Sequence, residues 1–213
     1  EFAWHGFARR LKTIVRCVEN VFQILPPDQI EFPENEVLTD VSVNIQAFIF
    51  NVFGAIDNLA WILVYEKDIR KPNGNKIPNS LVGFSKKCTV VRSSLSEEFC
   101  QYLDTLENWV DNLENFRHAL AHRIPLYVPP YVVTDDNMEA YQELEAQKAE
   151  VMLQPGDEYE RLDAAQEALA EFRPIMRHSF EEEGHTVVFH PQLLADFNTI
   201  DELGRRMLRE LDR

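Results

Sequence analysis

The densest group of residues that could do acid–base chemistry lies near position 120. The segment NFRHALAHR contains Arg117, His118, His122 and Arg123, and it ends shortly before Pro125. Imidazole titrates near neutral pH and can accept or donate a proton. An arginine can hold a phosphate or stabilise the charge that develops on it. This combination of side chains suits the cleavage of a phosphodiester.

Arg117 stands at an apolar position of its expected helix. Apolar residues there recur in alternating steps of four and three, the pattern of a helix packed against a partner helix: Phe99, Leu103, Leu106, Val110, Leu113 and Leu120. The same spacing demands an apolar residue at position 117. Because a buried guanidinium is costly unless it is paired or lines a cleft, we expect Arg117 to do one or the other.

A second misplaced charge lies in a long apolar segment earlier in the chain. Asp57 has Phe53 one turn before it and Trp61 one turn after it, so its carboxylate projects from an apolar helix face. We expect Asp57 and Arg117 to meet across the interface between their helices. Two interpretations stay open, namely an ion pair that only fixes helix register and a pair that belongs to a site.

The RHALAH segment that begins at Arg117 resembles the R-x4-6-H motif of the HEPN superfamily, in which a polar residue often follows the arginine. The AIDNLAW segment around Asp57 is similar to the acid-bearing helix of several prokaryotic members, and the resemblance covers residues 41–123. It implies a HEPN-like helical bundle that forms a homodimer with facing motifs. It also implies metal-independent endoribonuclease activity of the toxin, abortive-infection or CRISPR type, although many HEPN-like proteins are non-catalytic binding modules.

The resemblance assigns roles by position. Arg117 and His122 would be the catalytic pair and His118 the polar residue that assists, with Asp57 and Asn58 in support. Five positions on an ideal α-helix separate two side-chain directions by about 140°. The pair therefore needs an arginine that reaches around, a distorted last turn, or a second subunit.

A metal site is the alternative use of the two histidines. His118 and His122 are four residues apart and share one helix face, which suits two ligands of one metal ion. A third ligand would have to come from His5, Asp57 or Glu114. The neighbouring arginine opposes a cation, and paired Glu-x-x-His motifs are absent, so we expect no metal or other cofactor.

Charge limits the partners that the protein can bind. The 213 residues include 36 acidic and 21 basic ones, giving a formal net charge of −15, so a broad basic surface for RNA is disfavoured. The stretch 69–92 is the local exception, with six basic residues and no acidic one. Candidate RNA contacts are Lys86, Lys87 and Arg92 together with Arg123. An ordinary solvated loop is the other interpretation of this stretch.

The pattern of apolar, turn and capping residues predicts a mainly α fold in a single domain, 1–213, with a core of roughly 1–123. Helices are expected at 2–25, at 38–67 with Thr39 or Asp40 as N-cap, from Ser94 or Ser96 to 122, and at 191–211. Residues 124–133 should be extended, and 175–180 and 186–189 should form a small β-hairpin insertion.

Segment 135–171 is expected to be helical and split at Pro155-Gly156. It carries twelve acidic residues against two basic ones. Such a segment is a solvated face, binds a basic protein partner such as an antitoxin, or shields the cleft from non-specific RNA.

The apolar stretch 45–64 raises the question of a membrane span. It contains Gln46, Asn51, Asp57 and Asn58, which would be costly in lipid, so we expect the central helix of a soluble bundle and no membrane. The three cysteines are odd in number and lack a CxxC pair, and no segment looks like a cleavable signal. A cytoplasmic protein is therefore expected.

Overall fold

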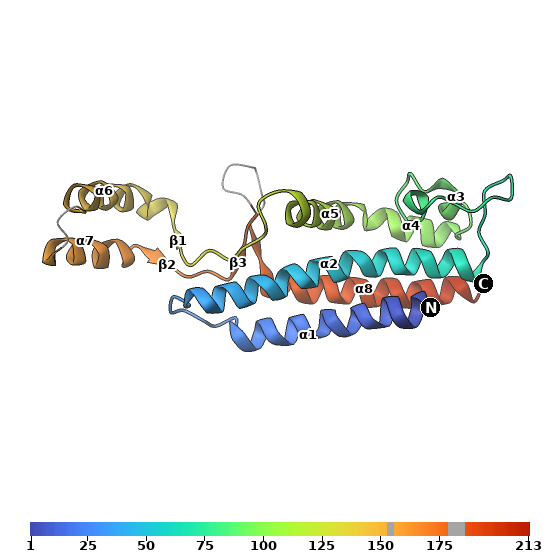
Figure 1. The fold of residues 1–213 in the computed structure, drawn as a ribbon, viewed down its shortest axis with the longest axis horizontal. Helices are drawn as coiled ribbons and strands as arrows, with labels where there is room; N and C mark the ends of the chain where they lie inside the picture. Colours follow the sequence, from blue (N-terminus) through green and yellow to red (C-terminus); the bar gives the residue numbers. More distant parts are fainter. Residues whose placement is uncertain (153–155, 179–185) are drawn as a thin grey trace.

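The computed structural model describes residues 1–152, 156–178 and 186–213, and it is mainly α-helical. Three long helices, α1 (Ala8–Ile24), α2 (Asn35–Glu66) and α8 (Phe189–Leu211), run side by side along the long axis (Figure 1). A π-helical segment, Phe2–Phe7, precedes α1. Because α2 contacts α1, α8 and α5, it is the central helix of the bundle.

A second layer covers one side of these helices (Figure 1). It consists of a 3-10 turn (Asn79–Leu81), α3 (Thr89–Arg92), α4 (Glu97–Thr105) and α5 (Glu107–His122). The segment RHALAH closes α5, so the second layer carries the residues expected to be catalytic.

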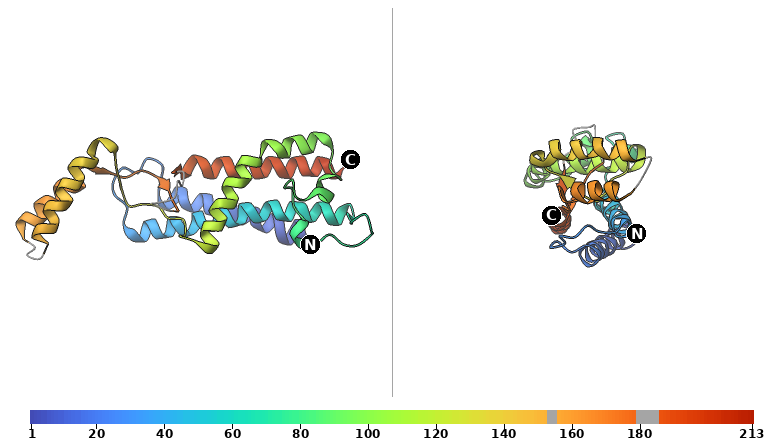
Figure 2. Two further views of the ribbon diagram at one scale, coloured as in Figure 1. Left: turned by 90° about the horizontal axis from the view of Figure 1, so that it is seen from above. Right: turned by 90° about the vertical axis from the view of Figure 1, so that its left-hand side faces the viewer.

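An arm extends beyond one end of the bundle (Figures 1 and 2). Strands β1 (Val132–Val133) and β2 (Ala170–Glu171) pair antiparallel at its base, with Val132 opposite Glu171. Helices α6 (Asp135–Val151) and α7 (Asp157–Glu167) pack on each other and form the arm itself. The expected acidic helices are confirmed, with Gly156 preceding α7.

The expected β-hairpin is present as two short strands. Strand β3 (Ile175–Met176) pairs antiparallel with β4 (Val187–Val188), which leads directly into α8. In the first expected strand, Arg177 forms an isolated bridge with Tyr127, and residues 179–185, which include the last two positions of that strand and the turn, lie outside the described residues. Helix α8 begins at Phe189, so Pro191 falls in its first turn, where a missing backbone N–H costs no helical hydrogen bond.

The hydrophobic core draws on both ends of the chain. Ile14 and Val21 of α1, Ile45 and Phe48 of α2, and Leu203 of α8 are all almost fully buried. The core therefore extends past residue 123, because α8 returns along α1 and α2. Helix α2 is long and apolar enough to cross a membrane, but half of its most apolar window is buried inside this bundle.

The N-cap expected for α2 is wrong. The helix begins at Asn35 with Glu34 as N-cap, and the Thr39 hydroxyl donates to the Asn35 carbonyl within the helix. Neither Thr39 nor Asp40 is needed as a cap, since the chain becomes helical directly after Pro33, as its fixed φ permits.

The helix expected from Ser94 or Ser96 to His122 is two helices. It breaks at Leu106, which ends α4 and precedes α5. Ser96 is confirmed as the N-cap of α4, where its hydroxyl accepts a hydrogen bond from the Phe99 backbone N–H at 3.2 Å. The apolar stripe is continuous through the break, because Leu103, Leu106 and Leu113 all contribute to the core.

Candidate functional site

Arg117 lies against α2, as its place on the apolar stripe predicts. Its guanidinium carbon sits 4.8 Å from the centre of the Phe53 ring, a cation–π contact, and the residue is half-buried. Among the described residues no carboxylate lies within ion-pair distance of this guanidinium. The positive charge of Arg117 is therefore stacked on a ring and still available to an anion.

Asp57 lies one turn beyond Phe53 on α2 and is exposed at the mouth of a cavity. Lost hydration raises the pKa of Asp57, and the nearby guanidiniums of Arg117 and Arg10 counteract that rise, while Glu114 reinforces it. Arg117 and Asp57 thus feel each other electrostatically without forming a direct ion pair. The two charges, which we expected to meet, lie near each other without direct contact.

Asn58 faces α1 and is engaged by another arginine. Arg10 donates from Nε to the Asn58 Oδ1 at 3.0 Å and from Nη1 to the Asn51 Oδ1 at 3.3 Å. Gly54 makes this approach possible, because a Cβ there would fall 2.3 Å from the Arg10 Cζ. Asn58 therefore supports Arg10 of α1 in the described structure.

The two histidines lie together on the last turns of α5. His118 and His122 are both exposed, and their ring centres are 5.6 Å apart. Because α5 stays a regular helix as far as His122, the separation of about 140° between Arg117 and His122 persists. The structure brings the histidines together, and it brings Arg117 to α2, but it does not bring these two groups together within one chain.

The described residues contain no group of three His, Cys, Asp or Glu side chains arranged to hold a metal ion. The alternative in which His118 and His122 share a metal with His5, Asp57 or Glu114 therefore lacks its third ligand here. Two histidines alone make an incomplete zinc site.

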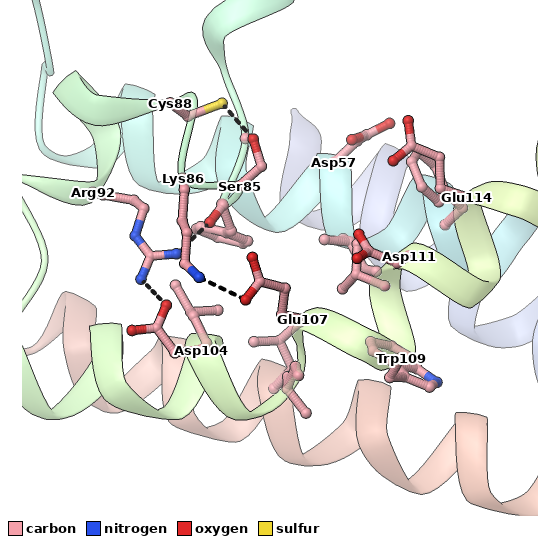
Figure 3. Close-up of a pocket in the computed structure, with 18 of the residues that line it drawn as sticks. Asp57, Ser85, Lys86, Cys88, Arg92, Asp104, Glu107, Trp109, Asp111 and Glu114 are labelled. Atoms are coloured by element: carbon pink, nitrogen blue, oxygen red, sulfur yellow. Dashed lines mark hydrogen bonds and ion pairs between the residues drawn. The ribbon is translucent and has the colours of Figure 1, made fainter.

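A cavity of about 250 Å³ opens between α2, the loop before α3, and helices α4 and α5 (Figure 3). Its floor is apolar, and its polar rim carries five carboxylates: Asp57, Asp104, Glu107, Asp111 and Glu114. Two of these carboxylates pair with basic residues, leaving three without a Lys or Arg partner among the described residues. This cavity repels phosphate groups.

Two of the four candidate RNA contacts form ion pairs with carboxylates of this rim. Lys86 pairs with Glu107 at 2.6 Å, and Arg92 pairs with Asp104 at 2.7 Å (Figure 3). Arg92 also donates to the carbonyls of Phe84 and Cys100, which ties the loop to α4. Its hydrogen bonds give Arg92 a structural role.

The other two candidate contacts lie at the surface. Lys87 and Arg123 are both exposed, and Arg123 directly follows the last residue of α5. Their contact with RNA stays a prediction.

A smaller cavity of about 170 Å³ lies on the other side of α5, against α8 and the β3–β4 pair. At its wall Asp196 is only 4% exposed and accepts hydrogen bonds at 2.7 Å from the Trp109 Nε1 and the Gln192 Nε2. Burial raises the pKa of Asp196 to about 6, although both donors favour the ionised form. A carboxyl that titrates so close to neutrality is suited to acid–base or recognition chemistry.

The residues around Asp196 were missed from the sequence, although a signal was present. The apolar stripe of α8 contains Leu193, Ile200 and Leu203, and the same spacing places Asp196 on that stripe. A charged residue on an apolar stripe is also the feature that singles out Arg117 on α5. Applied to α8, the same test identifies Asp196 as a buried charge that needs partners.

No protein-family model, curated protein or solved structure matches this chain.

Proposed function

We propose that the protein is a metal-independent endoribonuclease of the HEPN type that acts as a homodimer. The observation that carries this proposal is the exposed pair His118 and His122 at the end of α5, beside an Arg117 that has no carboxylate partner among the described residues. Histidines turned into the core and an arginine neutralised by Asp57 would have favoured a silent module instead.

In the proposed reaction, His122 removes a proton from a ribose 2′-hydroxyl, and the resulting oxygen attacks the adjacent phosphorus. The bond to the 5′-oxygen of the next nucleotide breaks, and that oxygen takes a proton from an imidazolium such as His118. Arg117 stabilises the extra negative charge on the phosphorus oxygens. One imidazole is needed neutral and the other protonated, so the rate should pass through a maximum as the pH is varied.

The second subunit follows from the geometry of α5. Arg117 contacts Phe53 on α2, whereas His118 and His122 face solvent about 100° and about 140° around the helix. A partner that presents the arginine side of its own α5 to this face would bring its arginine to these histidines, and vice versa. The isologous contact of a two-fold dimer provides this exchange.

The setting of the proposed enzyme is a bacterial-type toxin or phage-defence system in the cytoplasm, by the HEPN resemblance alone. A basic protein partner, such as an antitoxin, would find its complement in the acidic arm, where α6 and α7 carry much of the negative charge. RNA would approach the exposed end of α5, which lies one turn beyond Glu114, a carboxylate of the larger cavity.

The test is cleavage of a mixed pool of structured and single-stranded RNAs with EDTA present. We expect the unaltered protein to cleave, and His122→Ala and Arg117→Met to lose roughly 100-fold or more of the rate, the scale of a lost acid–base or electrostatic contribution. Methionine retains an apolar stem over Phe53, so the Arg117 variant removes charge with little loss of packing.

Two matched controls share the residue types but not the location. His5→Ala changes an exposed histidine, and Arg205→Ala changes an exposed arginine of α8 that pairs with Asp201 one turn before it. Both controls should cleave at the rate of the unaltered protein. Cleavage that EDTA abolishes, or equal loss in all four variants, contradicts the proposal.

A catalytically silent binding module is the second candidate, and one observation favours it. The described chain keeps Arg117 apart from His122, and three carboxylates without basic partners line the cavity beside Arg117. This candidate predicts that folded, dimeric protein cleaves no RNA in the pool while still binding a basic protein.

A further inference from the structure

The smaller cavity combines a buried acceptor with flat apolar walls. Three rings line it, from Trp109 and Phe116 of α5 and from His178 beside β3. Its volume is about 170 Å³, on the scale of a single small ring system.

Asp196 supplies the acceptor. Both hydrogen bonds from Trp109 and Gln192 go to the same oxygen, Oδ1. The second oxygen, Oδ2, takes no hydrogen bond from a described residue, and it is not one of the fully enclosed polar atoms, so it is accessible from the cavity. Because little of Asp196 reaches bulk solvent, this open acceptor can take a hydrogen bond from a ligand in the cavity.

Amide side chains surround the same opening. Asn112 and Asn115 of α5 are exposed at the rim, and Gln192 of α8 is half-buried. Each amide offers both a donor and an acceptor. Rings that pack against a flat ligand, with amides and a carboxylate at its edge, are what recognition of an unstacked base requires.

We propose that this cavity binds a nucleobase, whose edge donates an N–H to the Asp196 Oδ2 and whose faces pack against the lining rings. The inference rests on the proposed ribonuclease function only in making that base part of an RNA. It assigns to α5 a recognition site in addition to the proposed catalytic pair.

The position of the cavity along α5 agrees with this role. Asn115 at the rim and His122 are seven residues apart, so they lie on nearly the same helix face, roughly 10 Å apart along the axis. His118 lies between them. A base held in the cavity would direct its ribose and phosphate along α5 toward the two histidines.

The experiment is calorimetric titration of the full chain, with EDTA present, using guanosine, adenosine, cytidine and uridine separately. Nucleosides contain no phosphodiester, so their binding does not depend on cleavage. We expect at least one nucleoside to bind, and Asp196→Asn to weaken that binding tenfold or more, because an amide nitrogen would then face the donor. The control Asp201→Asn, on the surface of the same helix, should bind as the unaltered protein does.

Binding of that nucleoside should also weaken about tenfold between pH 7.5 and pH 5, as Asp196 gains a proton and loses its acceptor. If Asp196→Asn does not fold, Asn112→Ala at the exposed rim replaces it, with a loss of several-fold expected. The proposal is overturned if no nucleoside binds the folded protein, or if the Asp196 and Asp201 variants bind equally. Spermidine binding that depends on Asp196, without nucleoside binding, would assign the cavity to an amine and also overturn it.

Nucleoside binding without RNA cleavage would support the recognition site and would contradict the proposed ribonuclease function alone.

Discussion

Asp196 shows how a single buried carboxyl couples the site to pH. Its pKa is about 6 in the folded chain, raised from an ordinary value of 3.8 by burial, and its side chain is 4% exposed. The folded state therefore favours the protonated form. The contribution of Asp196 to stability is fully present below pH 3.8 and is lost as the pH rises through 6.

We predict that Asp196→Asn gains stability relative to the unaltered protein as the pH rises. A pKa difference of this size corresponds to a change of up to about 3 kcal/mol in the free energy of unfolding between pH 4 and pH 8. Urea denaturation of both proteins across this range measures the difference. A constant difference across the range would show that Asp196 does not titrate near 6.

The pKa of His190 shifts in the opposite direction, so its effect on stability must be separated from that of Asp196. Burial lowers the pKa of His190, while its Nε2 donates to the Leu25 carbonyl at 2.7 Å. Its Nδ1 has no hydrogen-bond partner in the part of the chain that the structure describes, and burial favours the neutral ring in the folded state. Stability from His190 is lost as the pH falls below the ordinary value of 6.5. Comparing variant with parent cancels this contribution.

At the scale of elements, a polar clamp joins the beginning of α4 to the end of α8. The Glu210 carboxylate, which is buried, accepts from both the backbone N–H and the hydroxyl of Ser96 at 2.7 Å. The same hydroxyl accepts from the Phe99 N–H. Glu210 thus plays, from another helix, the part that a glutamate three residues on plays in a capping box.

We predict that Ser96→Ala destabilises the protein by about 1 to 2 kcal/mol, because it removes the α4 cap and one hydrogen bond to a buried carboxylate. Ser93→Ala is the matched control, since Ser93 is exposed and donates only to the Val90 carbonyl. Chemical denaturation should place the control within about 0.5 kcal/mol of the parent. Equal effects of the two substitutions would show that the clamp adds nothing.

At the scale of the whole molecule, charge and shape are divided between bundle and arm. Segment 135–171 carries twelve acidic residues against two basic ones, which is two-thirds of the net charge of −15. The arm stands beyond the bundle (Figure 2), and helix α6 has no buried residue. The arm therefore contributes a negative field with little hydrophobic core.

We predict that replacing residues 135–169 by a short Gly-Ser linker strengthens RNA binding several-fold at low salt. The ends of the deleted segment are close, because Val133 pairs with Ala170, so the linker spans them easily. Filter binding at two salt concentrations measures the effect, which should shrink at high salt. Binding that weakens after the deletion would instead make the arm part of the RNA-binding surface.

The sequence alone determines the helices and several of their ends. The local features that determine them are apolar residues at helical spacing, the prolines after α1 and the Ser96 cap. Each of these features acts on residues only a few positions away in the chain. The acidic arm and the misplaced Arg117 are likewise visible in the chain. The α2 cap and the break at Leu106 are not, because neighbouring segments decide between local alternatives of similar free energy.

Only the tertiary structure decides which functional groups meet. Trp109 and Asp196 are 87 residues apart in the chain, and their hydrogen bond exists because α8 returns along the bundle beneath α5. The same packing leaves Arg117 over Phe53 rather than in an ion pair with Asp57. Helical periodicity fixes the face on which a side chain lies, but the partner on that face depends on how distant segments pack.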